Sequence, residues 1–416
     1  MTNFFSSLSL IFMKREIRKI FVFWFFWCFI LILYQQVVTN RFFLKKPDTA
    51  LNWTVFETQE YSWDNRPYLL EDFLNQHVAW DSEFYLAIAD KGYDNDRVRV
   101  AGGRGEKYSL NYAFFPFYPV MIKVFSIPFI FLEKSKILSH IEVLVLSGVI
   151  VSMLGVLAGF LSFYFFLKKN DFSSEEAFRG IFYLSIFPSA FFMGEVYTEG
   201  LFCGLLFLTL ILTILKRRWL ACIFASLLFL TRPAGIMVVF FIFLEFLKET
   251  NFIKNKRFNF KDILVFVPLV IPFFTFVIWK FSPLGYRFEF VQSVFFGRQG
   301  INIFDSLNNW KEALFLVLFG GNMPTRIYYS IEFVVMIIAL LSIILESRKL
   351  LSLSILGFLF FFFSFFSGVA QGMHRYLLFT PTIYTMLIKA GRNEVFDRAA
   401  KKRIFCSRLP NWMHSI

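Results

Sequence analysis

The sequence predicts an all-α integral membrane protein, built as one multispanning helical bundle. Apolar residues make up 57% of its 416 residues and charged residues only 18%, whereas soluble domains sit near about 45–50% and about 25%. Phenylalanine alone contributes 63 residues, and the mean hydropathy is +0.58. This composition argues against a soluble enzyme, a nucleic-acid module or a disordered chain. The net charge of +13 is typical of basic cytoplasmic loops and does not require a nucleic-acid partner.

The apolar stretch at 20–38 predicts the first transmembrane helix. Basic residues between 14 and 19 precede it and place the N-terminus in the cytoplasm. We expect the helix to be retained, because no small-residue cleavage site follows its apolar core. Residues 40–111 then form a large extracytoplasmic loop, which we expect to bear interfacial helices.

The remaining membrane helices are predicted within 112–390. The strongest candidates are long enough to cross about 30 Å of hydrocarbon; they are 143–167, 263–281, 327–345 and 350–369. Shorter apolar runs at 182–244 and 376–388 fit short tilted, re-entrant or buried helices. Basic clusters are predicted to be cytoplasmic; they are 216–218, 254–257, 348–349 and the tail at 391–416. This scheme gives about ten crossings with both ends inside.

The segment 112–132 is the least certain crossing, because it contains Pro116, Pro119 and Pro128. If the basic pair at 168–169 is cytoplasmic, only one of 112–132 and 143–167 can cross. The second stretch is longer and more apolar. We therefore expect the proline-bearing segment either to dip into the membrane or to lie along its outer face.

The residues from Trp80 to Ala89 predict an amphipathic helix at the membrane interface. Asp81 stands at the start of this helix, where the helix dipole stabilises a carboxylate. Two interpretations of Asp81 follow. It is either an ordinary N-cap residue or an acidic group placed for chemistry.

Five motifs occur in a fixed order along the chain. They are Trp80-Asp81-Ser82 with Gly92-Tyr93, Phe114-Phe115-Pro116-Phe117-Tyr118-Pro119, Phe187-Pro188-Ser189 leading to Tyr197-Thr198-Glu199-Gly200-Leu201-Phe202, Thr231-Arg232-Pro233, and His374-Arg375-Tyr376 with Pro381. Over about residues 76–381 the chain resembles the PIG-V family. These mannosyltransferases add the second mannose to glycosylphosphatidylinositol, and they have bacterial relatives.

The resemblance implies a GT-C-type glycosyltransferase bundle. Such an enzyme takes mannose from polyprenyl- or dolichyl-phosphate mannose and transfers it to a lipid-linked or glycan acceptor on the extracytoplasmic or luminal face. Its catalytic carboxylate lies in the first large extracytoplasmic loop, at the position of Asp81. The family pattern has Ser where this chain has Gly200, which we interpret as a small-for-small exchange. The expected partners are lipid-linked donor, acceptor and membrane lipids, with no nucleic acid.

The predicted chemistry is an inverting transfer in which a hydroxyl attacks the anomeric carbon of a sugar-1-phospholipid. Asp81 is the candidate general base. Arg232 and Arg375 are candidates for the phosphate, because a guanidinium offers a two-point fork and stays charged. The remaining predicted substrate-binding residues are His374, Glu199, Tyr197 and Trp80.

Some of these residues also have structural interpretations. Glu199 lies near the start of a helix predicted from about Val196, where a carboxylate can simply offset the helix dipole. Arg232 marks either a hairpin tip or a kink in one long helix, and the flanking basic clusters favour the hairpin. Asp94 and Asp96 resemble a metal pair, but their spacing also fits an ordinary turn. No metal ligand set is predicted, although a divalent metal remains an option.

A transporter or flippase for a lipid-linked sugar is the alternative from another functional class. Such proteins often show inverted repeats and broken helices at mid-membrane. This sequence shows no repeat, and its charged candidates gather at one face. The composition favours a bacterial inner membrane, while the same motifs would suit the endoplasmic reticulum in a eukaryote.

Overall fold

The computed structural model describes residues 2–41, 72–78, 81–94, 100–101, 108–250, 260–298 and 300–392. Within them, regular structure is helical apart from one antiparallel pair of two-residue strands, β1 (Val100–Ala101) and β2 (Tyr108–Ser109). The predicted all-α class is therefore confirmed.

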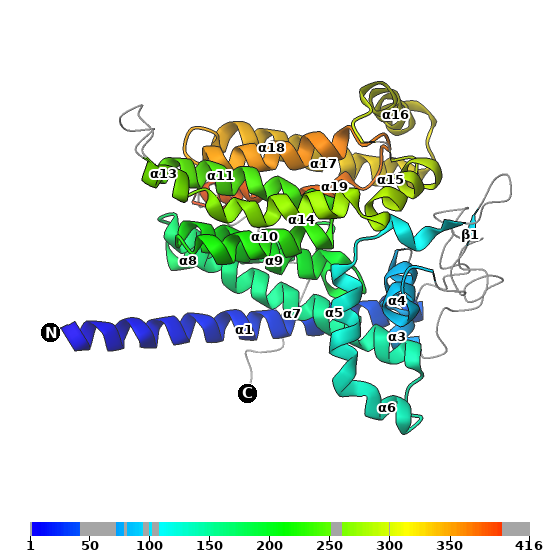
Figure 1. The fold of residues 1–416 in the computed structure, drawn as a ribbon, viewed down its shortest axis with the longest axis horizontal. Coiled ribbons are helices and arrows are strands. Elements are labelled where there is room, and N and C mark those ends of the chain that lie inside the picture. Colours follow the sequence, from blue (N-terminus) through cyan, green and yellow to red (C-terminus); the bar gives the residue numbers. More distant parts are fainter. Residues whose placement is uncertain are drawn as a thin grey trace, which may run out of the picture.

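Figure 1 shows the helices coloured in chain order. In order they are α1 (Thr2–Arg41), α3 (Asp72–Asn75), α4 (Ser82–Lys91), α5 (Phe117–Ser126), α6 (Ile130–Lys134), α7 (His140–Lys169), α8 (Ser174–Ser185), α9 (Thr198–Ile214), α10 (Arg218–Thr231), α11 (Val238–Glu249), α13 (Phe260–Leu264), α14 (Val270–Phe281), α15 (Pro283–Phe295), α16 (Ile303–Phe315), α17 (Met323–Glu346), α18 (Leu351–Phe365), α19 (Met373–Leu377) and α20 (Pro381–Ala390). Short helical turns are Leu110–Ala113, Ile127–Phe129, Ala190–Gly194, Pro233–Met237, Val267–Leu269 and Leu316–Gly320.

Four helical stretches are long and apolar enough to cross a membrane. They are Lys14–Val37, His140–Lys169, Asp262–Phe281 and Met323–Glu346. Shorter apolar helices of 10–17 residues accompany them; these are α9, α10 and α18. The described chain is thus a helical protein of membrane type.

The stretch predicted as a long span at 350–369 is shorter than expected. Its helix, α18, has 15 residues and is about 22 Å long at 1.5 Å per residue. The chain leaves the helix before Gly368, whose φ is 96°, and Gly372 has a φ of 79°. Left-handed backbone of this kind favours glycine and cannot continue an α-helix.

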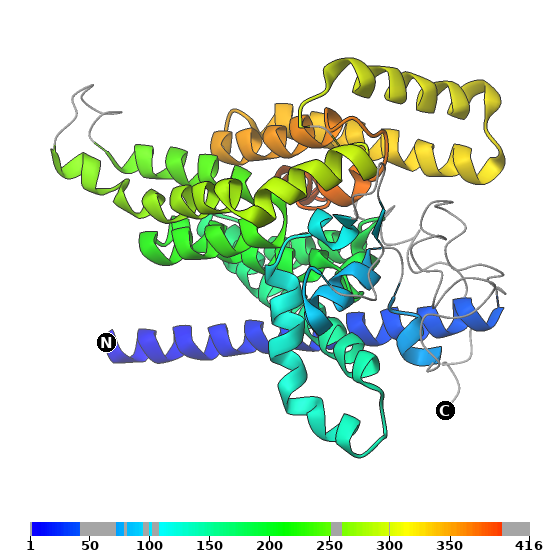
Figure 2. The same ribbon diagram turned by 45° about the vertical axis from the view of Figure 1, so that its right-hand side comes forward.

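The proline-bearing segment 112–132 forms no span-length helix. It is divided into the turn Leu110–Ala113, α5, the turn Ile127–Phe129 and α6. In both views α5 runs across the direction of α1 rather than along it (Figures 1 and 2). The segment is thus too broken to form one straight membrane-spanning helix, and its placement at the outer face stays a prediction.

Helices α7 and α9 approach each other through facing glycines. Gly155 and Gly159 lie four apart on α7, and Gly200 and Gly204 lie four apart on α9. A Cβ added at Gly200 would lie 2.4 Å from the carbonyl oxygen of Ser152. Close backbone approach at such glycines is a common way to pack helices in membranes. The interpretation of Gly200 as a small-for-small exchange was therefore wrong, because no space is left for a serine side chain.

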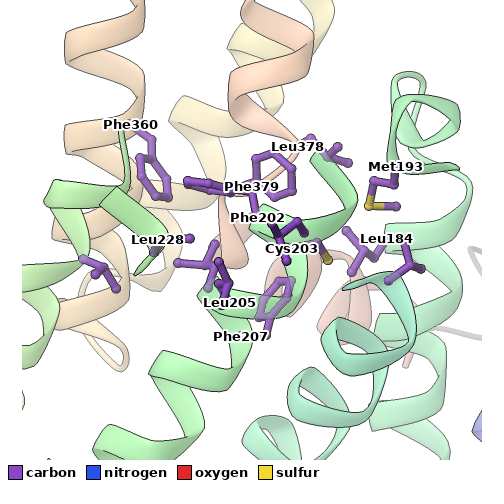
Figure 3. Packing of buried hydrophobic residues seen from close by; sticks show 14 of the residues in the cluster. Leu184, Met193, Phe202, Cys203, Leu205, Phe207, Leu228, Phe360, Leu378 and Phe379 are labelled. Atoms are coloured by element: carbon purple, nitrogen blue, oxygen red, sulfur yellow. The ribbon is translucent and has the colours of Figure 1, made fainter. Parts of the chain in front are cut away.

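The largest buried apolar cluster surrounds α9 (Figure 3). The Phe202 ring lies 4.8 Å from Phe379 and 6.4 Å from Phe360, measured between ring centroids. Phe207 lies 4.3 Å from Phe163 of α7. Helix α9 is thus packed centrally, and the residues at its start are held from several sides.

A chain of polar contacts ties helix ends together at one end of the bundle. The pairs are Glu16 with Tyr164, Arg179 with the Gly391 carbonyl, Lys389 with Glu346, Ser352 with Glu245, and Arg218 with Glu249. These contacts link α1 to α7, α8 to α20, α20 to α17, α18 to α11, and α10 to α11. The described basic clusters therefore share one end, as their charge predicted.

Candidate active site

The Asp81 carboxylate faces an arginine instead of capping its helix. Asp81 has helical backbone angles (φ −63°, ψ −18°), and its side chain makes no capping hydrogen bond to α4. Its Oδ2 lies 3.6 Å from Nη2 of Arg375, and 31% of the side chain is exposed. Asp81 therefore occupies the N-cap position of α4, but its carboxylate does not cap the helix. Trp80, which was predicted beside it, lies outside the described residues.

Glu199 is fully buried in the first turn of α9 and holds two guanidinium groups. Its Oε1 accepts hydrogen bonds from Nη1 of Arg232 at 2.7 Å, and from Nε and Nη2 of Arg375 at 3.0 and 2.8 Å. The helix begins at Thr198, two residues later than predicted. Glu199 therefore does more than offset the helix dipole, because it brings together arginines that lie far apart in sequence.

Arg232 lies at the tip of an antiparallel hairpin formed by α10 and α11. The backbone is extended at Arg232 (φ −152°, ψ 144°), and a turn starting at Pro233 leads into α11. The start of α10 meets the end of α11 where Nη2 of Arg218 lies 2.5 Å from Oε2 of Glu249. The hairpin was the favoured sequence interpretation, and it is confirmed over a single kinked helix.

Aromatic rings flank the Arg375 guanidinium. Its Cζ lies 4.5 Å from the ring centroid of Phe192 and 4.8 Å from that of Tyr197. Such contacts stabilise a cation and fix the plane of the guanidinium. The Tyr197 side chain also supports Asp81, because its hydroxyl accepts a hydrogen bond from the Asp81 backbone N–H at 3.2 Å. Tyr197 is 1% exposed, so this geometry gives it a positioning role.

A buried carboxylate in α17, Glu332, anchors the segment that carries Arg375. Glu332 is 0% exposed and accepts hydrogen bonds from the backbone N–H groups of Gly372 and His374, each at 2.7 Å. The Nδ1 of His374 lies 3.0 Å from Oε1 of Glu332. Among the described contacts, His374 is thus engaged with Glu332 and not with Asp81. The sequence analysis missed Glu332, although an acid within an apolar stretch is itself a signal.

A second buried carboxylate, Glu195, joins α1 to the chain just before Asp81. Its Oε2 lies 3.2 Å from Nδ1 of His77, and its Oε1 accepts a hydrogen bond from the Gln35 amide. The N–H of Val196 donates to the His77 carbonyl at 3.2 Å. Glu195 therefore fixes the two segments that lead to Asp81 and to Glu199.

Two more residues missed by the sequence analysis complete the arginine cluster. The ring of Tyr376 lies between two cations, with its centroid 5.1 Å from Cζ of Arg232 and 5.4 Å from Cζ of Arg298. In the sequence, Tyr376 stood out only as part of the motif His374-Arg375-Tyr376, without a role of its own. Arg298 lies in a connection between helices, and no sequence pattern singled it out.

The electrostatic setting of Asp81 suits a base. Burial raises the pKa of its carboxyl above the usual range, while the Arg375 guanidinium acts against that rise and Glu199 adds to it. Arg298 and Arg232 also favour the ionised form. A carboxylate with a raised pKa accepts a proton more readily than an ordinary one.

Of the two acidic residues that resemble a metal pair, Asp94 and Asp96, the structure describes only Asp94. Asp94 accepts a hydrogen bond from the Tyr112 hydroxyl at 2.7 Å and lies 3.5 Å from Nη1 of Arg287. Asp96 lies outside the described residues. Among the residues that are described, no three His, Cys, Asp or Glu side chains gather around a point that could hold a metal ion.

The geometry thus joins Asp81, Glu199, Arg232 and Arg375 from four separate segments. Comparison with protein-family models gives no match for this chain, and comparison with curated proteins gives none either.

Proposed function

We propose that this protein is a membrane glycosyltransferase of the GT-C type that transfers mannose from a polyprenyl-phosphate-linked donor to a lipid-linked or glycan acceptor. The observation that carries the proposal is the pairing of a partly exposed carboxylate, Asp81, with an arginine cluster built on a buried acid. The Oδ2 of Asp81 lies 3.6 Å from Nη2 of Arg375, which also bonds Glu199. A base next to fixed cations is what transfer from a phospholipid-linked sugar requires.

In the proposed reaction, Asp81 accepts the proton that is released and the phosphate is the leaving group. An acceptor hydroxyl attacks the anomeric carbon while Asp81 takes its proton, and the new glycosidic bond forms. The bond from that carbon to the phosphate oxygen breaks, and its electron pair stays on the phosphate. The arginine cluster stabilises this negative charge. Because attack and departure occur on opposite sides of the carbon, the sugar inverts its configuration.

We further propose about ten crossings with both ends on the cytoplasmic side, four of them by helices of span length and the others by shorter helices. The proposed crossings are α1, α7, α8, α9, α10, α11, the α13–α14 stretch, α17, α18 and α20. We assign the basic end to the cytoplasmic face, because cytoplasmic segments of membrane proteins carry an excess of positive charge. The arginine cluster lies at the opposite end of α9 and α10, which faces the periplasm if the protein resides in a bacterial inner membrane.

The shorter helices set the depth of the proposed site. Helix α10 has 14 residues, which is about 21 Å, while α17 has 24 residues, which is about 36 Å. An arginine at the tip of the α10–α11 hairpin would then lie below the outer membrane surface. Ionised groups at such depth are costly and usually serve a function. Recessed cations fit a lipid-linked phosphate, whose chain enters from the bilayer.

The test is Asp81→Asn, assayed in membranes with radiolabelled polyprenyl-phosphate mannose and candidate acceptors, with and without a chelator. Loss of a general base typically lowers the rate by about 10²–10⁴-fold. Asp90→Asn is the matched control, because Asp90 lies on the same helix, α4, but pairs with His140 at 3.3 Å. Near-normal transfer by Asp81→Asn, in a protein that folds as the wild type does, would remove Asp81 from the role of base. A transporter without transferase activity would show no transfer in any variant.

A further inference from the structure

Arg298 is the cation of the arginine cluster that no described carboxylate neutralises. Arg232 and Arg375 both bond the buried Glu199, and Arg375 also faces Asp81. Among the described residues, no acid forms an ion pair with Arg298. Its guanidinium instead lies 5.4 Å from the ring centroid of Tyr376. A stacked arginine keeps its edge donors free, because the ring contacts only its face.

The connection that carries Arg298 is fixed against the segment leading to Arg375. Gly297 has a φ of 65°, a left-handed conformation that favours glycine, and the N–H of Arg298 donates to the Gln292 carbonyl at 2.9 Å. The N–H of Asn302 donates to the Phe366 carbonyl at 2.8 Å, at the end of α18. Arg298 is therefore held on both sides, which lowers the entropic cost of binding a ligand.

The charges of the cluster leave a site for one anion. Three guanidinium groups, those of Arg232, Arg298 and Arg375, face two carboxylates, those of Asp81 and Glu199. The surplus of one positive charge equals the single negative charge of a phosphodiester. The two carboxylates of Glu199 and Asp81 together balance Arg232 and Arg375, with which they pair, so the surplus resides on Arg298. This also explains why Arg298 opposes the rise in the pKa of Asp81 even without a direct bond to it.

We propose that Arg298 is the residue that binds the phosphate of a lipid-linked substrate, while Arg232 and Arg375 mainly build the site around Glu199. The inference deepens the proposed function and rests on it for the identity of the lipid. It changes the assignment made from sequence, in which Arg232 and Arg375 were the phosphate-binding pair. Tyr376 acts as the positioning residue that holds Arg298 and Arg232 on one ring.

The experiment measures binding of polyprenyl monophosphate to the purified full-length protein in nanodiscs. Arg298→Gln is expected to weaken binding roughly tenfold to a hundredfold, which is the range for a lost hydrogen bond to a charged group. Arg298→Lys keeps the positive charge but loses the two-point fork, so its affinity should lie between that of the wild type and that of Arg298→Gln. Arg287→Gln is the matched control, because Arg287 also stacks on a tyrosine, Tyr112, at 4.8 Å, but is paired with Asp94.

The outcomes separate this inference from the proposed function. Unchanged binding by Arg298→Gln, equal losses in Arg298→Gln and Arg287→Gln, or no binding by the wild type would each overturn it. Inorganic phosphate is the second probe, and equally tight binding of it would exclude a lipid-linked ligand. Arg298-dependent binding without any sugar transfer would leave the inference standing and overturn the transferase proposal. Where transfer is measured, Arg298→Gln should raise KM for the donor more than it lowers kcat.

Discussion

The carboxylate of Glu199 is the group whose removal should cost the fold most. Glu199→Gln keeps the size of the side chain and removes the negative charge that holds Arg232 and Arg375. Both guanidiniums bond the same oxygen, at 2.7 and 2.8 Å, so their bonded nitrogens lie at most about 5.5 Å apart. Two such charges repel each other by about 3 kcal/mol at an effective dielectric constant of about 20.

The expected loss of stability agrees with what is known of buried ion pairs. Removing one partner of such a pair typically costs about 3–5 kcal/mol, because an uncompensated charge stays buried. Glu199→Gln should therefore unfold at a clearly lower temperature than the wild type in detergent, measured by tryptophan fluorescence and by retention on a sizing column. The double variant Glu199→Gln with Arg232→Gln removes the repulsion and should recover part of the loss.

A thermodynamic cycle decides whether this reasoning holds. If the effects of Glu199→Gln and Arg232→Gln are coupled, the double variant loses less stability than the sum of the losses measured for the two single variants. Simple additivity would show that the two side chains do not depend on each other. Wild-type stability of Glu199→Gln would show that the guanidiniums find other anions, and the proposed architecture of the site would then fail.

Three further predictions concern the supports of the site and its protonation. Glu332→Gln should cost about 1–3 kcal/mol of stability and lower transfer, because the N–H groups of Gly372 and His374 donate to different carboxylate oxygens and an amide replaces one of these with an NH2 donor. Unchanged unfolding and turnover would argue against that anchor. Gly200→Ser should destabilise the protein by about 1–3 kcal/mol or more in thermal unfolding, since its Cβ would overlap two carbonyl oxygens, and a stable variant would show that α7 and α9 separate easily. Because the pKa of Asp81 is raised, its proton binds at higher pH than that of an ordinary aspartate, so kcat/KM should fall as the pH drops through this raised pKa. This acidic limb should be missing in Asp81→Asn, and its persistence there would assign it to another group.

The sequence alone was sufficient for the helical class and for the distribution of basic charge. These properties follow from composition and from local runs of apolar residues, which need no knowledge of contacts. It also singled out Glu199, Arg232 and Arg375 as candidates, because charges beside apolar stretches are conspicuous, and the structure brings the three together. The length of α18 could not be read in this way, since the apolar run continues beyond the residue at which the chain turns.

Only the tertiary structure decided what these residues do. An aspartate at the start of a helix looks the same in sequence whether it caps the helix or faces Arg375 from another segment. Glu332, Arg298 and the facing glycines of α7 and α9 matter through partners far away along the chain. Such contacts depend on how helices pack against each other, and local periodicity does not predict which side chains from distant parts of the sequence come into contact.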